Sequence, residues 1–131
     1  MGASVVALAL SPVATAQQEA YQYVRTESGQ VRCVISAEEA VCERASADGF
    51  PGAPAGADGT PSNLAIVHAE GDFNWNVGNI GDGGSSEVVL TYRTPFSFHG
   101  WTVVSTFDGT RLTNDGTGHG MFVSVDGVSS Y

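Results

Sequence analysis

Hydrophobic and polar residues alternate with a period of two over short runs in most of this chain, which is typical of half-buried β-strands. Two runs near the C-terminal end place their alternate residues on one buried face: Trp101, Val103, Ser105 and Phe107 in the first, and Met121, Val123 and Val125 in the second. No segment shows helical periodicity over more than one turn. The pattern therefore predicts a chain built almost wholly from strands.

Further strand-like runs occur at residues 20–26, 30–36, 64–69, 73–77 and 87–93. Between them, residues 78–86 are expected to form a turn, and residues 95–100 a short loop that leads to Trp101. Gly or Pro interrupts the chain at intervals of about eight to twelve residues, a spacing typical of sandwiches and barrels. We predict an all-β fold, a small antiparallel β-sandwich or barrel of about seven to eight strands with one hairpin disulfide.

The two cysteines belong to one predicted hairpin. If Ala37 and Glu38 form its two-residue loop, Cys33 lies directly opposite Cys42. Opposed Cα atoms in an antiparallel pair are about 4.5 to 5.5 Å apart, within the range that a disulfide spans. A free dithiol metal or redox site is the alternative, but this spacing without a nearby His fits no zinc pattern, and CxxC is absent. We predict a disulfide between Cys33 and Cys42.

The first residues predict export. A short apolar run at residues 5–10 precedes Ala14, Thr15 and Ala16, which form an AxA-type cleavage site. We expect residues 1–16 to be a signal peptide, truncated at its start because no Lys or Arg precedes the apolar run, and residues 17–131 to be a single all-β domain. A buried helix is the alternative reading of this segment. Because about 20 apolar residues are needed to cross a bilayer, the run is too short for a membrane span.

Charge narrows the range of partners. The 131 residues contain 14 acidic and five basic side chains, all five of them Arg, for a formal net charge of −9. Such a surface repels phosphate backbones and anionic lipids, so nucleic-acid binding and electrostatic membrane docking are disfavoured. We expect a monomer whose partner is an unknown protein or a small-molecule ligand.

Residues 48–63 interrupt the strand pattern, because Gly, Pro, Ala and Asp dominate them and no periodicity survives. A loop of this length is uncommon inside a compact domain. We expect an ordered meander packed by Phe50, with a binding loop as the alternative. Six Asp-Gly steps in the chain supply carboxylate oxygens for calcium, but none has the spacing of a calcium loop, and turn formation explains them.

The polar, glycine-rich middle of residues 101–125 concentrates most of the chemistry in the chain. It contains four candidate binding residues, Arg111, Asn114, Asp115 and His119. His119 lies between glycines and could pair with Asp115 for acid–base chemistry, while Arg111 could bind a carboxylate or sulfate bidentately. The same residue types also form tight turns and Asx caps. We favour an ordered turn in which these side chains bond the backbone or one another.

Other catalytic and binding patterns are weak. No GxSxG elbow is present, and both cysteines are expected to be oxidised, which disfavours nucleophilic catalysis. His68, His99 and His119 lack metal-binding spacing, so we expect no metal and no cofactor. Trp75 and Trp101 fall on alternating strands and are expected to fill the core, with a sugar-stacking platform as the alternative.

Several short motifs, among them VRCVIS, VCE, GFPGAP, FNWNVGN and the long run GWTVVSTFDGTRLTNDGTGHGMFVSVDGV, resemble small exported proteins of mycobacteria and related actinobacteria. The likeness covers most of residues 20–128. It implies an extracellular or cell-envelope location and supplies no catalytic residue.

Together these features predict a secreted or cell-envelope β-domain that acts as a non-enzymatic binding or structural module. Two alternatives remain: a small hydrolase-like enzyme that uses Asp115 and His119, and a sugar or lipid binder that uses the loop from Arg111 to His119. A shared concave pocket around the loop residues would favour the enzyme, whereas exposed aromatic rings or a deep apolar cavity would favour the binder.

Overall fold

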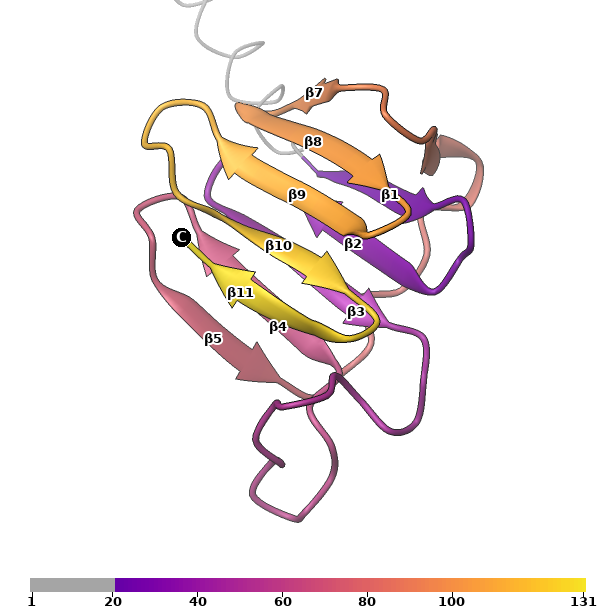
Figure 1. The fold of residues 1–131 in the computed structure, drawn as a ribbon, viewed down its shortest axis with the longest axis vertical. Helices are drawn as coiled ribbons and strands as arrows, with labels where there is room; N and C mark the ends of the chain where they lie inside the picture. Colours follow the sequence, from indigo (N-terminus) through magenta and orange to yellow (C-terminus); the bar gives the residue numbers. More distant parts are fainter. Residues whose placement is uncertain (1–20) are drawn as a thin grey trace, which may run out of the picture.

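The computed structural model describes residues 21–131, so the predicted signal peptide lies outside the described residues. Eleven strands form two sheets that face each other as a sandwich (Figure 1). The first sheet has the order β5 (Phe73–Asn76), β4 (Leu64–His68), β3 (Glu39–Arg44), β2 (Val31–Ile35), β1 (Gln22–Thr26) and β6 (Val88–Leu90). The second has the order β11 (Gly127–Ser130), β10 (Gly120–Ser124), β9 (Gly109–Asn114), β8 (Trp101–Thr106) and β7 (Phe96–Phe98).

The all-β sandwich is as predicted, but the number of strands is higher than the expected seven to eight. Residues 95–100 contain the short strand β7, which three aromatic or hydroxyl residues were too few to indicate. The polar middle of residues 101–125 contains β9, whose outward polar residues disguise its strand character. The strand expected at residues 87–93 is only β6, and it pairs with β1 in parallel because the chain crosses the sheet before reaching it.

The core lies between the sheets and takes alternate residues of each strand. Val24, Ile35 and Val67 from the first sheet meet Val103 and Leu112 from the second, and all five side chains are fully buried. The period of two puts these residues on one face, because successive side chains in a strand point to opposite sides.

The predicted hairpin between β2 and β3 has the expected register. Cys33 pairs with Cys42, their Cα atoms are 4.0 Å apart, and the two residues form a disulfide that faces the core. Ala37 and Glu38 form the intervening loop, because the backbone N–H of Ser36 donates to the carbonyl oxygen of Glu39. In the chain-entropy model, closing a loop of this length contributes about 2 to 3 kcal/mol.

The connection from β5 to β6 crosses the outer face of the six-stranded sheet. Its Ile80 carbonyl accepts a hydrogen bond of 3.1 Å from the phenol of Tyr23 on β1, and its Gly81 carbonyl accepts one of 2.6 Å from Arg32 on β2. Gly83 passes so close to Tyr23 that a Cβ there would lie 2.5 Å from the Tyr23 Cβ. This connection, residues 77–87, is called the strap below, and it requires glycine at position 83.

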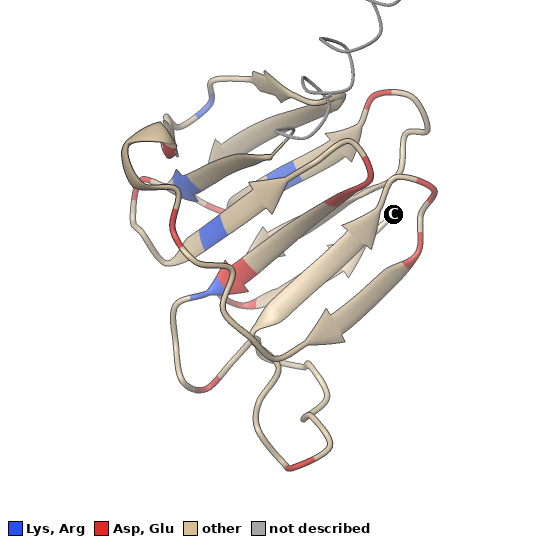
Figure 2. Ribbon diagram, turned by 180° about the vertical axis from the view of Figure 1, so that it is seen from behind, with Lys and Arg blue, Asp and Glu red and all other residues tan. Residues whose placement is uncertain are grey.

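The same outer face carries the ion pairs of the first sheet, and Figure 2 colours the positions of the charged residues along its strands. Arg32 Nε lies 3.2 Å from Glu87, and Arg32 also lies 3.8 Å from Glu43, while Arg25 lies 3.9 Å from Glu87. These partly exposed pairs contribute little to stability, about 0 to 1 kcal/mol each. They do, however, neutralise two of the five Arg side chains.

Residues 48–63 form a loop that projects beyond one end of the sheets, with an isolated bridge between Ala55 and Pro61 (Figure 1). Phe50 anchors it as expected, because its side chain is 3% exposed and its ring centroid lies 5.7 Å from that of Trp75. At the tip, hydrogen bonds from the side chain and backbone of Thr60 lower the pKa of the Asp58 carboxyl below its ordinary value. The loop is thus an ordered meander.

Candidate functional site

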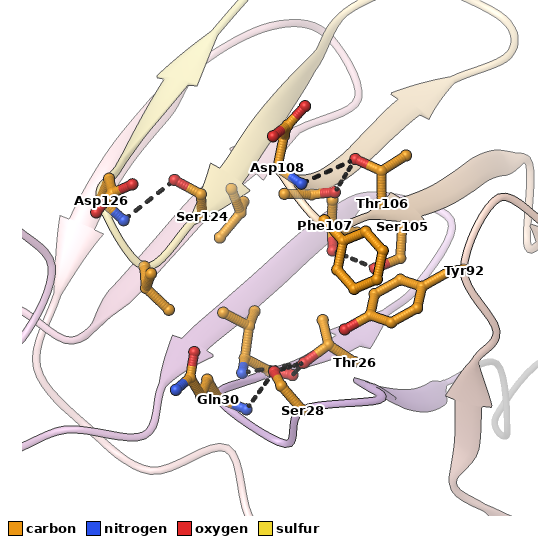
Figure 3. Close-up of a pocket in the computed structure, with 15 residues that line it drawn as sticks. Thr26, Ser28, Gln30, Tyr92, Ser105, Thr106, Phe107, Asp108, Ser124 and Asp126 are labelled. Atoms are coloured by element: carbon orange, nitrogen blue, oxygen red, sulfur yellow. Dashed lines mark hydrogen bonds between the residues drawn. The ribbon is translucent and has the colours of Figure 1, made fainter.

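A cleft opens at one end of the sandwich, where the turns β1–β2, β8–β9 and β10–β11 approach one another (Figure 3). It has a volume of about 240 Å³. Its lining includes three groups of side chains: Thr26, Ser105 and Thr110 on the floor, Tyr92 and Phe107 at one side, and Asp108 and Asp126 at the rim. Because this volume lies below the usual range for ligand pockets, about 300 to 1,000 Å³, the cleft suits a small molecule rather than a polymer segment.

The floor of the cleft is made by hydroxyl groups that occupy core positions. Ser105 pairs with Thr110 across β8 and β9, both are almost fully buried, and the Thr110 hydroxyl donates to Ser105 Oγ at 3.1 Å. Thr26 lies on the facing sheet, and its Oγ1 is 3.1 Å from the Oγ of Ser28. Val103 and Leu112 occupy the neighbouring inward positions, so the core changes from apolar to hydroxyl-bearing at this end.

An aromatic pair, formed by the exposed Phe107 and the half-buried Tyr92, stands beside this floor. Thr106 pairs with Gly109, which leaves Phe107 and Asp108 as the two-residue turn between β8 and β9. Phe107 is therefore 82% exposed rather than on the buried face predicted for it, because β8 ends one residue before it. Its ring lies 4.6 Å from that of Tyr92, with 38° between the two planes. A large apolar side chain at a turn tip is unusual, since turns favour Gly, Asn and Asp.

The two carboxylates at the rim are placed by matching turns. The backbone N–H of Asp108 donates to Thr106 Oγ1 at 3.2 Å, and that of Asp126 donates to Ser124 Oγ at 3.1 Å. Each turn continues with glycine, and a Cβ on Gly109 would lie 2.6 Å from the Phe122 ring. No described Arg or His lies within ion-pairing distance of Asp108 or Asp126, so the rim is acidic.

The four candidate binding residues that the sequence suggested do not line the cleft. They lie at the other end of the five-stranded sheet or on its outer face. Asn114 is buried, and its Oδ1 accepts backbone hydrogen bonds from Gly116 and Thr117 at 3.0 and 3.1 Å. It is an Asx cap of the β9–β10 turn, in line with the ordered turn that we favoured. Its buried amide is committed to the backbone and is poorly placed to meet a ligand.

Asp115 and His119 do not form an acid–base pair. Asp115 Oδ1 accepts a hydrogen bond of 2.6 Å from Thr102 on β8, whereas His119 Nδ1 lies 3.2 Å from the carbonyl oxygen of Tyr131. The His119 ring packs over Gly71, where a Cβ would lie 3.0 Å from the ring. Both side chains are exposed and committed to separate neighbours. This geometry gives no support to the hydrolase alternative.

Arg111 lies apart from the other three candidates, on the outer face of the five-stranded sheet. Its guanidinium carbon is 5.3 Å from the ring centroid of Phe122 and 5.2 Å from that of Tyr131. Such cation–π contacts hold the group in place and leave its N–H edges free. The sequence placed Arg111 near His119 along the chain, but the strand separates them.

The remaining candidates serve structure. Trp101 is fully buried and so cannot stack on a sugar, whereas Trp75 is partly buried and its ring packs against Phe50 and Phe73 at the edge of the core. His68 lies 3.5 Å from Glu39, and His99 is an exposed turn residue with φ 49°. Among residues 21–131, no three His, Cys, Asp or Glu side chains are grouped so as to hold a metal ion. No helix of the described residues could span a membrane.

The cleft residues were not predicted as a site from the sequence, although two features of the sequence point to them. Ser105 and Thr110 occupy inward positions of the strands, and Phe107 directly precedes the Asp108–Gly109 turn. Asp-Gly is a strong hairpin signal, so Phe107 would have been expected at a turn tip rather than in the core.

Comparison with protein-family models, with curated proteins and with solved structures found no match for this chain.

Proposed function

We propose that this chain is an exported, non-enzymatic binding domain and that the cleft holds one neutral sugar ring. The observation that carries the proposal is the pair of exposed Phe107 and half-buried Tyr92 beside a cleft whose lining includes the accessible hydroxyl groups of Ser28, Thr106 and Ser124. Sugars present a C–H face that packs on aromatic rings and a rim of hydroxyls that donate and accept hydrogen bonds. The cleft offers a partner for each.

The charge of the rim supports a neutral ligand. Asp108 and Asp126 accept hydrogen bonds from hydroxyl groups and repel anions, and no described Arg lines the cleft. A small organic cation would also suit aromatic rings and carboxylates. The accessible hydroxyl groups of Ser28, Thr106 and Ser124 favour the sugar, because they can accept hydrogen bonds from sugar hydroxyls, whereas a quaternary ammonium has no hydrogen-bond donor to offer them.

Export is supported by the disulfide and by the apolar N-terminal run. Disulfides persist in oxidising compartments and are rare in the cytosol, so the Cys33–Cys42 bond fits a secreted or envelope protein. The resemblance to exported actinobacterial proteins points to the same location and stays a prediction.

Binding is expected to be weak. A sugar ring with its substituents has about 12 non-hydrogen atoms, and about 0.3 kcal/mol for each gives about 4 kcal/mol. That free energy corresponds to a Kd of about 1 mM. Affinity useful to a cell would then come from longer chains or from several copies of the domain.

Calorimetric titration with glucose, galactose, mannose, xylose and N-acetylglucosamine tests the proposal. We expect at least one of them to bind the wild type and Phe107→Ser to lose that binding by tenfold or more. Val77→Ser is the matched control, because Val77 is another exposed apolar residue and lies outside the cleft. Binding of tetramethylammonium with no binding of any sugar, or equal losses in the two variants, would contradict the proposal.

A further inference from the structure

A second hollow lies on the other side of the β8–β9 hairpin, on the outer face of the five-stranded sheet. Val104, Thr106, Asp108, Gly109, Arg111 and Phe122 line this outer groove, which has a volume of about 440 Å³. Thr106, Asp108 and Gly109 also line the cleft, so the two hollows share the hairpin. A ligand bound in one could continue into the other around the turn.

Arg111 sets the outer groove apart from the cleft. It is the only charged residue within the strands of the five-stranded sheet. Within residues 21–131, the ion pairs of Arg side chains involve Arg25 and Arg32, and none involves Arg111. A protein with a net charge of −9 thus keeps one guanidinium unpaired on this face.

The guanidinium is also held in position before any ligand arrives. Phe122 lies directly opposite Arg111 in the β9–β10 register, and Tyr131 approaches it from the β11 side. The Tyr131 hydroxyl is fixed by Thr113 Oγ1 at 2.6 Å. An arginine stacked on rings has already lost much of its side-chain freedom, so binding a planar anion through its N–H edge costs less entropy.

The rest of the outer groove suits the body of a sugar rather than a bare anion. Phe122 and Val104 offer an apolar surface, whereas Thr106 and Asp108 offer a hydroxyl and a carboxylate. Asp108 repels an anion placed beside it but accepts hydrogen bonds from hydroxyl groups. The fitting ligand therefore carries a carboxylate at one end, for Arg111, and hydroxyl groups at the other.

We infer that the outer groove is a second subsite that takes a carboxylated sugar, a uronic acid, with its carboxylate on Arg111 and its ring on Phe122. This inference rests on the proposed function, because both place sugar rings against the same hairpin. It adds that the preferred glycan is acidic, with a neutral ring in the cleft next to a uronate in the outer groove.

The test is a pair of titrations followed by the backbone and Arg side-chain N–H resonances of the full chain. The probes are methyl β-D-glucuronide and methyl β-D-glucoside, which differ in the carboxylate alone. We expect the glucuronide to shift the Arg111 Nε–H signal and the amides of Val104 and Phe122, which line the outer groove but not the cleft, and the glucoside at equal concentration to leave these unmoved. The affinity for glucuronide should fall as sodium chloride is raised.

Three variants complete the experiment. Arg111→Gln should weaken glucuronide binding at least tenfold, and Arg111→Lys should weaken it severalfold because a lysine loses the bidentate fork. Arg25→Gln, which removes one positive charge from the opposite face, should change it less than twofold. The inference is overturned if the glucuronide leaves the outer groove unmoved, or if Arg25→Gln weakens binding as much as Arg111→Gln. The shifts that the glucoside causes at cleft residues test the proposed function separately. Sugar binding in the cleft and uronate binding in the outer groove can therefore fail independently of each other.

Discussion

The indole Nε1 of Trp101 donates a hydrogen bond of 2.8 Å to the carbonyl oxygen of Ser36, 65 positions away in the sequence. Trp101 begins β8 in one sheet, and Ser36 follows β2 in the other. The bond is buried and therefore ties the two sheets together at the end of the sandwich opposite the cleft. A buried carbonyl needs such a donor, because an unsatisfied one costs about 1 to 3 kcal/mol.

Trp101→Phe is expected to lower the free energy of unfolding by about 2 to 4 kcal/mol, since it removes the donor to Ser36 and leaves a small cavity. Urea denaturation followed by circular dichroism measures the loss. Trp75→Phe is the control, because Trp75 is only partly buried and forms no side-chain hydrogen bond to residues 21–131. Equal losses in the two variants would contradict the role assigned to the Trp101 bond.

Asn114→Ala is expected to lower the free energy of unfolding by about 1 to 2 kcal/mol, because two backbone N–H groups lose their acceptor. The carboxylate of Asp115, in contrast, accepts its hydrogen bond from the Thr102 hydroxyl rather than from the backbone of the turn. Asp115→Ala should therefore cost less than about 0.5 kcal/mol. Thermal denaturation of both variants measures the two losses of stability. A larger loss for Asp115→Ala than for Asn114→Ala would contradict the conclusion that Asn114 is the residue that caps the turn.

Gly83→Ala should destabilise the fold by about 1 to 3 kcal/mol, because its new Cβ collides with Tyr23 and pushes the strap off the sheet. Gly116→Ala is the matched control. Neither glycine has a positive φ, and a Cβ on Gly116 would meet only the Asn114 side chain at an ordinary 3.4 Å. If chemical denaturation gives the two variants the same stability, the strap does not depend on close contact with Tyr23.

The sequence predicted those parts of the fold that follow from local pairing and alternation. The register of β2 and β3 came from a two-residue loop, and with it the disulfide of Cys33 and Cys42. Two features depend on contacts between distant residues and left little local signal: the parallel pairing of β6 with β1 and the strap over Tyr23. The short strand β7 pairs locally with β8, but its three residues are too few to show a pattern.

The candidate site was predicted less well, for a physical reason. Reading along the chain grouped Arg111, Asn114, Asp115 and His119, but a strand sends neighbouring side chains to opposite faces, so Arg111 faces outward and Asn114 inward. The cleft, in contrast, brings together Thr26, Tyr92, Phe107 and Asp126, which lie on four separate segments. Only the packing of the two sheets places them side by side.

The most direct test of the sugar-binding account is to map, by amide shift perturbation, where the five sugars of the calorimetric titration bind on the full chain. The account predicts that the largest shifts cluster around the cleft, at Thr106, Phe107, Asp108 and Asp126, and that Phe107→Ser abolishes them. The account is contradicted if none of the five sugars moves the cleft amides at tens of millimolar, or if the shifts are confined to the β9–β10 turn with Asp115 and His119.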